Sequence, residues 1–305
     1  MPPPSSTNPS GGTIEALYEQ VRNSVATSES AVSAEVTQIA PEIRVLALRT
    51  PTLPPAAHTN AYLVGPVRGP QLVIDPGSPY PDQQAALDRV LAEDADAGRP
   101  LATIVLTHHH GDHVGGAQAL ADRWNVPIAA HANTARRLAG RVNITHELRD
   151  GDQIGELTAI YTPGHADGHL CFARPGYVIA GDMVAGLGTI LIDPSEGDMA
   201  LYLASLRLLL ARPAAALLPA HGPAIADGPA KLREYIAHRT MREDRVVAAL
   251  AGRPDATSRE LVMDVYADTP PALWGLAERS LRAHLDKLVH EERAREVSPG
   301  RWSAR

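Results

Sequence analysis

The chain has 305 residues, of which 44% are hydrophobic and 21% are charged, so it holds enough apolar sequence for one large α/β domain and a smaller second domain. The net charge is −7, and an acidic chain argues against strong nonspecific binding to nucleic acid. The single cysteine, Cys171, excludes an internal disulfide and a cysteine-rich zinc module, and its apolar surroundings predict a core residue.

The N-terminal part, residues 1–40, is predicted to be an extension of unknown role. Residues 1–12 are rich in Pro, Ser and Gly and predict disorder, while residues 13–25 have helical spacing without an obvious partner. This segment lacks the basic and apolar regions of a secretory signal, and no apolar run reaches the ~18 residues that span a bilayer. We therefore expect a cytoplasmic protein that does not bind membranes.

Residues 41–228 predict an α/β domain in which strands come first and then alternate with helices. Strands are predicted at residues 43–48, 61–64, 72–74, 102–106, 127–130, 157–161, 170–173, 177–180 and 215–218. Helices are predicted at residues 82–95, 114–124, 133–139 and 198–211.

Residues 229–305 predict a small helical domain. A highly charged helix over residues 229–251 breaks at residues 252–254, and helices over 258–265 and 273–290 follow. Pro299 and Gly300 then form the turn of a terminal hairpin. Helices followed by a hairpin indicate a winged-helix-like domain, and the alternative is a helical extension packed on the first domain.

The main chemical signal is the run H-x-H-x-D-H, which contains His108, His110, Asp112 and His113 and follows the strand predicted at residues 102–106. Three imidazoles and a carboxylate so close together are costly to bury unless they have polar partners. His165, Asp182 and His221 also follow predicted strands, and loops at the carboxyl ends of neighbouring strands converge on one crevice. Imidazole and carboxylate ligands suit Zn²⁺, Mn²⁺ or Fe²⁺, and we expect two divalent ions, with zinc as the default.

These motifs resemble those of the metallo-β-lactamase superfamily. The resemblance covers about residues 43–228 and rests on residues 74–77, 107–113, 162–169, 181–182 and 219–222. It implies a four-layer αββα sandwich with the site at the edge between two sheets. It also implies one metal held by His108, His110 and His165, a second held by Asp112, His113 and His221, and Asp182 as the bridge between them.

Residues 58–65, 198–206 and 238–243, with the helical tail, look like the β-lactamase-like protein 2 group, whose animal member is a single-strand-preferring endoribonuclease. The resemblance then extends over about residues 43–305, and it implies that the chain is an endoribonuclease-like phosphodiesterase acting on single-stranded RNA. The long N-terminal extension is not typical of that group, so the contacts that form any oligomer remain open. A homodimer is one possible state.

Several further residues are candidates for the functional site, but each could instead have a purely structural role. His169 and Asp75 are expected behind the ligands, although Asp75 could equally form a turn. His238, Arg239 and Arg242 lie on one helix and could bind a substrate phosphate, but a solvated face paired with Glu243 and Asp244 is favoured. His109 is expected to point away from its neighbours. Surface or capping positions are expected for the remaining candidates, His131, His146, His284 and His290.

Two divalent ions about 3.5 to 4 Å apart would supply a bridging hydroxide as the nucleophile. Asp112 and Asp182 are the candidate catalytic carboxylates, because either of them, or metal-bound water, could protonate the leaving group. The alternative to RNA is a small-molecule ester or thioester, cleaved by a thioesterase or acyl hydrolase of glyoxalase II type. A β-lactamase is disfavoured by Asp182 and by the missing export signal. A structural metal site is disfavoured because seven ligands shared by two metals leave positions open.

Overall fold

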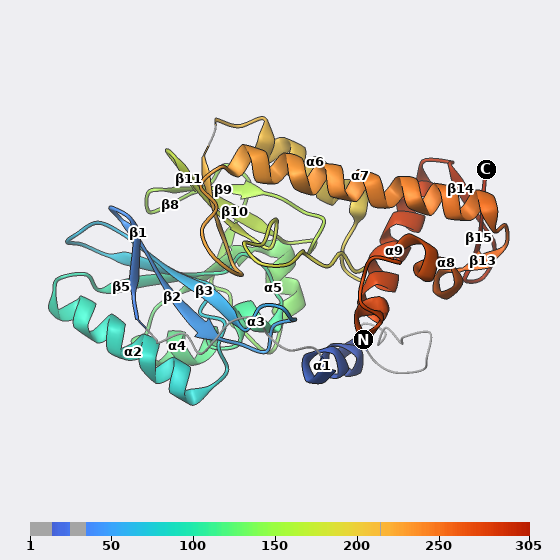
Figure 1. Ribbon diagram of the computed structural model, residues 1–305. Helices are drawn as coiled ribbons and strands as arrows, with labels where there is room; N and C mark the ends of the chain where they lie inside the picture. The colour runs from blue at the N-terminus through green and yellow to red at the C-terminus, as the bar shows by residue number, and fades with distance from the viewer. Residues whose placement is uncertain (1–13, 25–34, 214) are drawn as a thin grey trace.

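Two β-sheets face each other at the centre of the computed structural model, which describes residues 14–24, 35–213 and 215–305 (Figure 1). The predicted disorder of residues 1–12 lies outside the described residues. The first sheet has the order β1-β2-β3-β4-β5-β6-β7 and contains Thr37–Ala40, Ile43–Arg49, His58–Val64, Gln71–Ile74, Leu101–Val105, Ile128–His131 and His146–Leu148. The second has the order β12-β11-β10-β9-β8 and contains Ala216–Pro219, Tyr177–Gly181, Leu170–Arg174, Leu157–Tyr161 and Gln153–Ile154.

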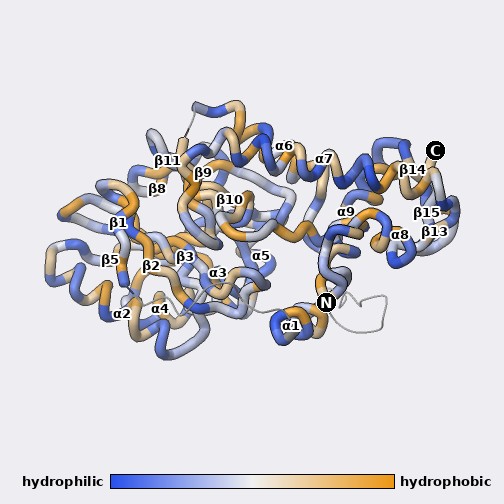
Figure 2. Tube along the Cα trace, viewed as in Figure 1, coloured by the Kyte–Doolittle hydropathy of each residue, from blue (hydrophilic) through white to orange (hydrophobic). Residues whose placement is uncertain are grey.

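Helices cover the outer faces of both sheets. Alternate residues of β2 point to opposite sides, so Leu46 packs with Leu87 of α2 (Pro81–Asp96), while Ile43 packs with Phe172 of β10 between the sheets. Beyond the second sheet, Tyr202 of α6 (Met199–Leu210) belongs to a third buried cluster. Figure 2 shows hydrophobic stretches along β2 and β10 in the interior. The layers therefore run αββα, which confirms the predicted sandwich.

Strand direction brings the candidate ligands to one edge. The strands β4, β5, β6 and β7 of the first sheet are parallel to one another. In the second sheet β11 is parallel to β12, and β10 is antiparallel to both β11 and β9, so β9, β11 and β12 point in the same direction. The ligand segments follow β5, β9, β11 and β12, and their shared edge is where the site forms.

The helix predicted over residues 114–124 is wrong as a single element. It is divided into α3 (Gly111–Val114) and α4 (Ala117–Trp124), so Asp112 and His113 lie on a helical turn rather than on a loop. The break occurs because the loop after β4 packs against Gly115 and Gly116. The Gly116 N–H donates to the Pro76 carbonyl oxygen at 3.1 Å. A Cβ atom on residue 116 would lie only 2.6 Å from that oxygen, so this close approach requires glycine.

The N-terminal extension is shorter than residues 1–40, because β1 pairs antiparallel with β2 and so belongs to the first sheet. A four-residue edge strand is too short for its periodicity to be recognised in the sequence. The predicted helix near residues 13–25 is confirmed as α1 (Ile14–Ser24), and it has a partner after all. Leu17 of α1 lies against Gly275 of α9, so α1 packs on the C-terminal part of the chain (Figure 1).

The C-terminal part has its own core, which includes Val246, Leu261, Leu285 and Trp302. It continues from α7 through β13, α8, η1, α9, β14 and β15, which are Gly228–Gly252, Ala256–Thr257, Ser258–Val265, Pro271–Leu273, Trp274–His290, Ala294–Ser298 and Arg301–Ala304. Its three short strands pair in the order β13-β15-β14 beside the helices, as the hairpin prediction required. Figure 1 shows α7 running from α6 on the sandwich to this winged-helix domain.

His284 corrects one prediction, since it is fully buried on α9 rather than exposed or capping. His131 caps α5 (Ala132–Leu138) by accepting from the Asn133 N–H, and His146 and His290 are exposed, as expected. Cys171 lies in the core. Among the described helices, none combines the length and the apolar character that crossing a membrane requires.

Candidate metal centre

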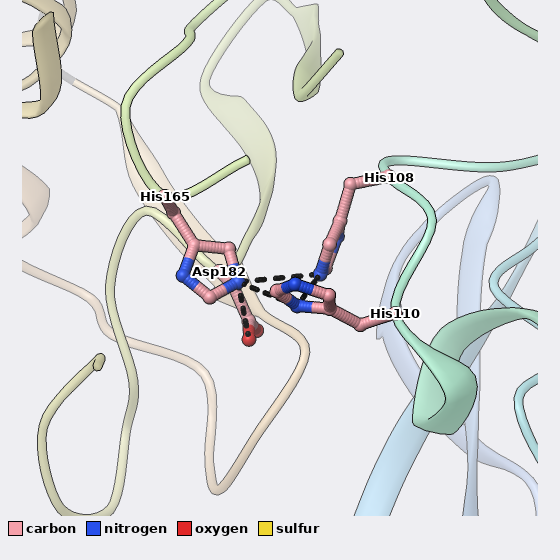
Figure 3. A group of neighbouring side chains, drawn as sticks. All are labelled: His108, His110, His165 and Asp182. Carbon is pink, nitrogen blue, oxygen red and sulfur yellow. Dashed lines mark hydrogen bonds and ion pairs between the residues drawn. The ribbon is translucent and has the colours of Figure 1, made fainter. Parts of the chain in front are cut away.

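Three histidine nitrogens meet at the edge between the sheets (Figure 3). His110 Nδ1 lies 2.8 Å from His108 Nε2 and 2.9 Å from His165 Nε2, and the last two atoms are 3.3 Å apart. A tetrahedral zinc ion with nitrogens at ~2.1 Å would hold such atoms roughly 3.4 Å apart, so this triangle is only slightly smaller than a metal would impose. Asp182 Oδ2 lies 3.5 Å from His165 Nε2 and completes the first cluster.

The hydrogen bonds behind His108 show which of its nitrogens carries the proton. The Thr107 hydroxyl donates to Asp75 Oδ2 at 2.6 Å, so its free lone pairs can only accept from His108 Nδ1 at 3.0 Å. His108 Nδ1 therefore carries the proton, and Nε2 presents a lone pair to the cluster. Asp75 also accepts from the Thr107 N–H at 2.8 Å. It is thus a buried carboxylate behind the cluster, as one of the two sequence interpretations expected.

The other two imidazoles are held in the same way. His165 Nδ1 donates to the Leu191 carbonyl at 2.9 Å, and His110 Nε2 donates to Glu196 Oε1 at 2.8 Å. Their remaining nitrogens therefore also present lone pairs to the centre. A proton on His110 Nδ1 would account for its contacts with His108 Nε2 and His165 Nε2, but not for the contact between those two atoms. A single cation at the centre accounts for all three nitrogen–nitrogen contacts.

A second cluster lies on the other side of Asp182 and contains Asp112, His113 and His221. His113 Nδ1 donates to Asp75 Oδ2 at 2.9 Å, and His221 Nδ1 donates to the His58 carbonyl at 3.0 Å, so both Nε2 atoms face inward. These Nε2 atoms lie 3.6 and 3.4 Å from Asp182 Oδ1, and His221 Nε2 lies 3.6 Å from Asp112 Oδ2. His113 Nε2 and Asp182 Oδ1 are buried without a hydrogen-bond partner. Such orphaned polar atoms fit a cation site.

Asp182 places one oxygen toward each cluster, and its backbone is held by His169. The Asp182 N–H donates to His169 Nε2 at 3.1 Å, and the other ring nitrogen of His169 contacts Thr162 Oγ1 at 2.8 Å. Gly181 adopts a φ of +50°, and a Cβ atom there would lie 2.5 Å from His169 Nε2. A glycine is therefore required before Asp182, and His169 lies directly behind Asp182.

The two clusters differ in their affinity for protons. Burial lowers the pKa of His165 to about 4, helped by the neighbouring His110 ring, and burial also lowers the pKa of His108 far below its ordinary value. At the second cluster the Asp182 carboxylate outweighs burial, raising the pKa of His221 to about 9 and the pKa of His113 well above its ordinary value. The second cluster therefore attracts positive charge. In the first cluster His108 and His165 keep their lone pairs free, whereas Glu196 outweighs burial at His110 and raises its pKa. Both properties suit divalent cations.

Glu196 is a site residue that sequence reasoning missed. Its two oxygens accept from His110 Nε2 at 2.8 Å and from His109 Nε2 at 2.9 Å, and these two rings hold the pKa of the Glu196 carboxyl far below its usual range although burial opposes this. His109 thus turns away from the ligand nitrogens, as predicted, but toward a specific partner. Glu196 lies in a turn between Asp193 and α6, where no motif or strand end marks it.

The prediction that the α7 arginines lie on a solvated helix face, paired with Glu243 and Asp244, is wrong. Arg239 and Arg242 are buried, and Glu243 forms an ion pair with Lys287 rather than with either of them. Together with His238 they line a cavity of about 800 Å³, which also reaches ligands from both histidine clusters. The sequence placed these side chains on one helix face but could not show that the sandwich and the C-terminal domain enclose that face.

The comparisons with known proteins agree with this architecture. Residues 54–221 match the model of the metallo-beta-lactamase superfamily, and residues 257–302 match the beta-lactamase associated winged helix domain. A beta-lactamase domain protein from Burkholderia ambifaria has the same fold, with a TM-score of 0.77 at 22% identity over 91% of this chain and 96% of that one. A metallo-beta-lactamase family protein from Thermus thermophilus gives a TM-score of 0.71 at 24% identity, covering 88% of this chain and 100% of that one.

Two curated relatives are similar over most of their length. The beta-lactamase-like protein 2 homolog of Caenorhabditis elegans is 32% identical over 76% of this chain and 79% of its own. The atrochrysone carboxyl ACP thioesterase of Passalora fulva is 29% identical over 77% and 71%, respectively. The first match, and the family model that covers more than half of the sequence, show that the chain belongs to the metallo-beta-lactamase superfamily, a family with a hydrolase fold.

Proposed function

We propose that this protein is a dinuclear metal-dependent acyl hydrolase that cleaves a thioester or ester. The observation that carries this proposal is the cavity of about 800 Å³ that reaches both histidine clusters. Besides the ligands, its wall contains many apolar side chains, among them Leu53, Pro54, Pro55, Leu187, Ile190, Leu191, Leu273 and Leu276, together with the arginines Arg22, Arg137, Arg141, Arg239 and Arg242. The apolar part of this wall suits an acyl chain or ring, whereas the polyanionic backbone of RNA favours a basic, open groove.

The ligand sets proposed here are His108, His110 and His165 for one ion and Asp112, His113 and His221 for the other, with Asp182 between them. Zinc suits these nitrogen and oxygen donors, as do Mn²⁺ and Fe²⁺. Two such ions, bound by these residues, would lower the pKa of a water molecule toward neutrality and would stabilise charge developing on a carbonyl or phosphoryl oxygen. We therefore expect about two equivalents of metal per chain in elemental analysis of the folded protein, and a value near zero would refute the proposal.

Asp112 and Asp182 are assigned as proton acceptors. Although burial opposes ionisation, the neighbouring His113 and His221 hold the pKa of both carboxyls below the usual range. Both groups are therefore ionised at pH 7 and have no proton to give before the reaction begins. Either can accept a proton from the attacking water and deliver it to the leaving thiol or alcohol.

The relative from Passalora fulva, which is named as a thioesterase, supports the acyl substrate class. A second candidate is the single-stranded endoribonuclease that the sequence resemblance implies. The observation favouring it is the pair Arg239 and Arg242 in the cavity wall, since guanidinium groups bind phosphates. The same cavity thus contains apolar surface that suits an acyl chain and arginines that suit RNA phosphates. We prefer the acyl substrate because the apolar surface is extensive.

The test is a parallel assay of the metal-loaded protein on a panel of acyl thioesters, a phosphodiester reporter and single-stranded RNA. The Asp182→Asn variant, purified identically, controls for contaminating esterases and nucleases. Metal-dependent thioester hydrolysis that the variant lacks would support the proposal. RNA cleavage without thioester hydrolysis would replace it with the second candidate, and inactivity on the whole panel would refute both.

A further inference from the structure

Arg239 is a buried cation at the end of the cavity formed by the C-terminal domain. Its side chain lines the cavity from α7, although the residue is only 2% exposed. One terminal nitrogen donates to the Ile190 carbonyl and lies 3.4 Å from Thr189 Oγ1. Its Nε atom is buried without a hydrogen-bond partner. The guanidinium group is thus held in place by uncharged acceptors and lies over the Tyr202 ring, 5.4 Å from its centre, while its buried Nε donor has no partner.

No carboxylate neutralises Arg239 in the part of the chain that the structure describes, because none lies within ion-pair distance of it. The carboxylates around it are paired with other cations. Asp268 lies 2.7 Å from Arg242 Nη1, and Glu243 lies 2.8 Å from Lys287 Nζ. Asp193 accepts from Arg279 Nε at 2.8 Å. A buried guanidinium group without a counter-charge is strongly unfavourable, so its environment is incomplete without an anion.

Two neighbours extend this cationic surface. The Arg242 guanidinium lies over the Tyr266 ring, 4.6 Å from its centre, and both residues line the cavity. The Tyr266 hydroxyl is buried and has no hydrogen-bond partner, so it is a second orphaned donor. His238 lies 3.4 Å from Arg242 Nε, and burial together with Arg239 and Arg242 lowers its pKa to about 4. His238 is therefore neutral at pH 7, and the positive charge resides on Arg239 and on Arg242, of which only Arg242 has a carboxylate partner, Asp268.

We propose that Arg239, Arg242 and the Tyr266 hydroxyl form an anion-binding subsite that recognises a carboxylate or phosphate on the substrate. Guanidinium groups pair with both oxyanions through short charge-assisted hydrogen bonds. The subsite lies in the same cavity as the histidine clusters, so a substrate bound there presents its apolar part and scissile bond to the metal end. The substrate assignment rests on the proposed acyl hydrolase function, whereas the binding of an anion does not.

The subsite is also linked to the metal centre through the backbone. Arg239 binds the Ile190 carbonyl, and the next carbonyl along the chain, that of Leu191, accepts from His165 Nδ1 at 2.9 Å. A change at Arg239 could therefore disturb His165 as well as the anion. Tyr266→Phe provides a second variant, because it removes a single hydroxyl and keeps the ring that packs under Arg242.

The first experiment compares three thioesters on the metal-loaded protein, with metal content measured in parallel. The first joins pentanoate to pantetheine and is neutral at both ends, the second carries a glutaryl group in place of pentanoyl, and the third carries phosphopantetheine in place of pantetheine. We expect one anionic thioester to have a kcat/KM about tenfold or more above the neutral one, mainly through KM. Whether the second or the third is favoured identifies the source of the oxyanion.

Arg239→Gln should abolish this preference, and Tyr266→Phe should reduce it without loss of metal. Arg233→Gln is the matched control, since Arg233 is exposed on the same helix. Equal rates for all three thioesters, or a preference that survives in both variants, would overturn the proposed subsite.

The second experiment measures anion binding directly, so it remains decisive if no thioester is hydrolysed. Calorimetric titration of the metal-loaded protein with inorganic phosphate and with glutarate should reveal an anion site that is lost in Arg239→Gln, weakened in Tyr266→Phe and retained in Arg233→Gln. Identical binding isotherms for all four proteins would place any bound anion elsewhere and refute the subsite. Loss of the site in the variants without any thioesterase activity would instead retain the subsite and refute the proposed reaction.

Discussion

The metal centre and Arg239 contribute opposite and unbalanced charge to one cavity. At the sandwich end, the carboxylates Asp112, Asp182 and Glu196 line the cavity beside imidazoles that present lone pairs, and no Lys or Arg pairs with any of these three in the described structure. At the other end, Arg239 is buried without a carboxylate partner among the described residues. We propose that cations complete the metal centre and that an anion completes the environment of Arg239. Because much of the remaining wall is apolar, although Arg22, Arg137 and Arg141 also line it, the cavity favours an amphipathic substrate with one anionic end.

This difference assigns separate tasks to the two domains. All seven candidate ligands come from strand ends of the sandwich, so that domain contains the groups for hydrolysis. The α7 arginines and Tyr266 of the C-terminal domain contribute the other end of the cavity. The winged-helix domain is therefore expected to select the substrate rather than to catalyse its cleavage.

Asp182→Asn should have the largest effect, because it removes the charge from the carboxylate that faces both clusters. Replacing a partner behind a metal ligand typically costs about 10- to 100-fold, so loss of this ligand should lower turnover by more than about 100-fold. Metal content measured by mass spectrometry should fall below two per chain. Asp122→Asn, an exposed carboxylate on α4, is the control. A fully active, fully loaded Asp182→Asn protein would show that the sandwich end is not a paired metal site.

Glu196→Gln should have an intermediate effect. The glutamine amide oxygen can still accept the hydrogen bond from His110 Nε2, which is 2.8 Å long in the wild type. The amide lacks the negative charge that orients the His110 ring and makes its metal-facing Nδ1 a better ligand. We expect the affinity for the first metal to fall by about 10- to 100-fold, with the second metal less affected. Competition with a chromogenic chelator measures both affinities. Glu147→Gln, an exposed carboxylate on β7, should change neither of them. Unchanged metal affinity in the Glu196 variant would leave that carboxylate with only a structural role.

The grouping of the seven candidate ligands at one edge could be predicted from the sequence because each follows a strand. His108, His110, Asp112 and His113 lie within one short run, and the resemblance to a known family arranged the other three around it. Parallel strands deliver their carboxyl ends to one edge, so local patterns were sufficient. Glu196 could not be found in this way. It reaches His110 across 86 residues of sequence, from a turn whose position depends on the packing of α6.

The arginines of α7 show a different limit. Helical periodicity correctly placed Arg239 and Arg242 on one face, but a charged helix usually turns such a face to solvent. Here the segment carrying Ile190 approaches from the sandwich, and Tyr266 lies under Arg242. A charged residue becomes buried through tertiary contacts that its own helix does not encode. For the same reason His284 was wrongly predicted to be exposed or capping.

Glu243 gives the smallest predicted effect, and it tests whether the cationic end is truly uncompensated. This carboxylate follows Arg242 in sequence but contacts Lys287 and His284 instead, and with Arg293 these groups lower its pKa from 4.5 to about 2 despite burial. A carboxyl whose pKa is lower in the folded state stabilises the fold above pH 4.5, and this contribution is lost as the pH falls toward 2. Glu243→Gln should therefore destabilise the protein at pH 6 and have progressively less effect below pH 4.5, as measured by urea unfolding.

The exposed Glu234 on the same helix is the control for Glu243, and Glu234→Gln should leave the pH dependence of unfolding unchanged. Phosphate binding should also be the same in Glu243→Gln and in the wild type, because the carboxylate is committed to Lys287 and does not neutralise Arg239. Tighter phosphate binding in Glu243→Gln would mean that Glu243 does offset the charge of Arg239. The contrast between the two ends of the cavity would then be weaker than the ion pairs indicate.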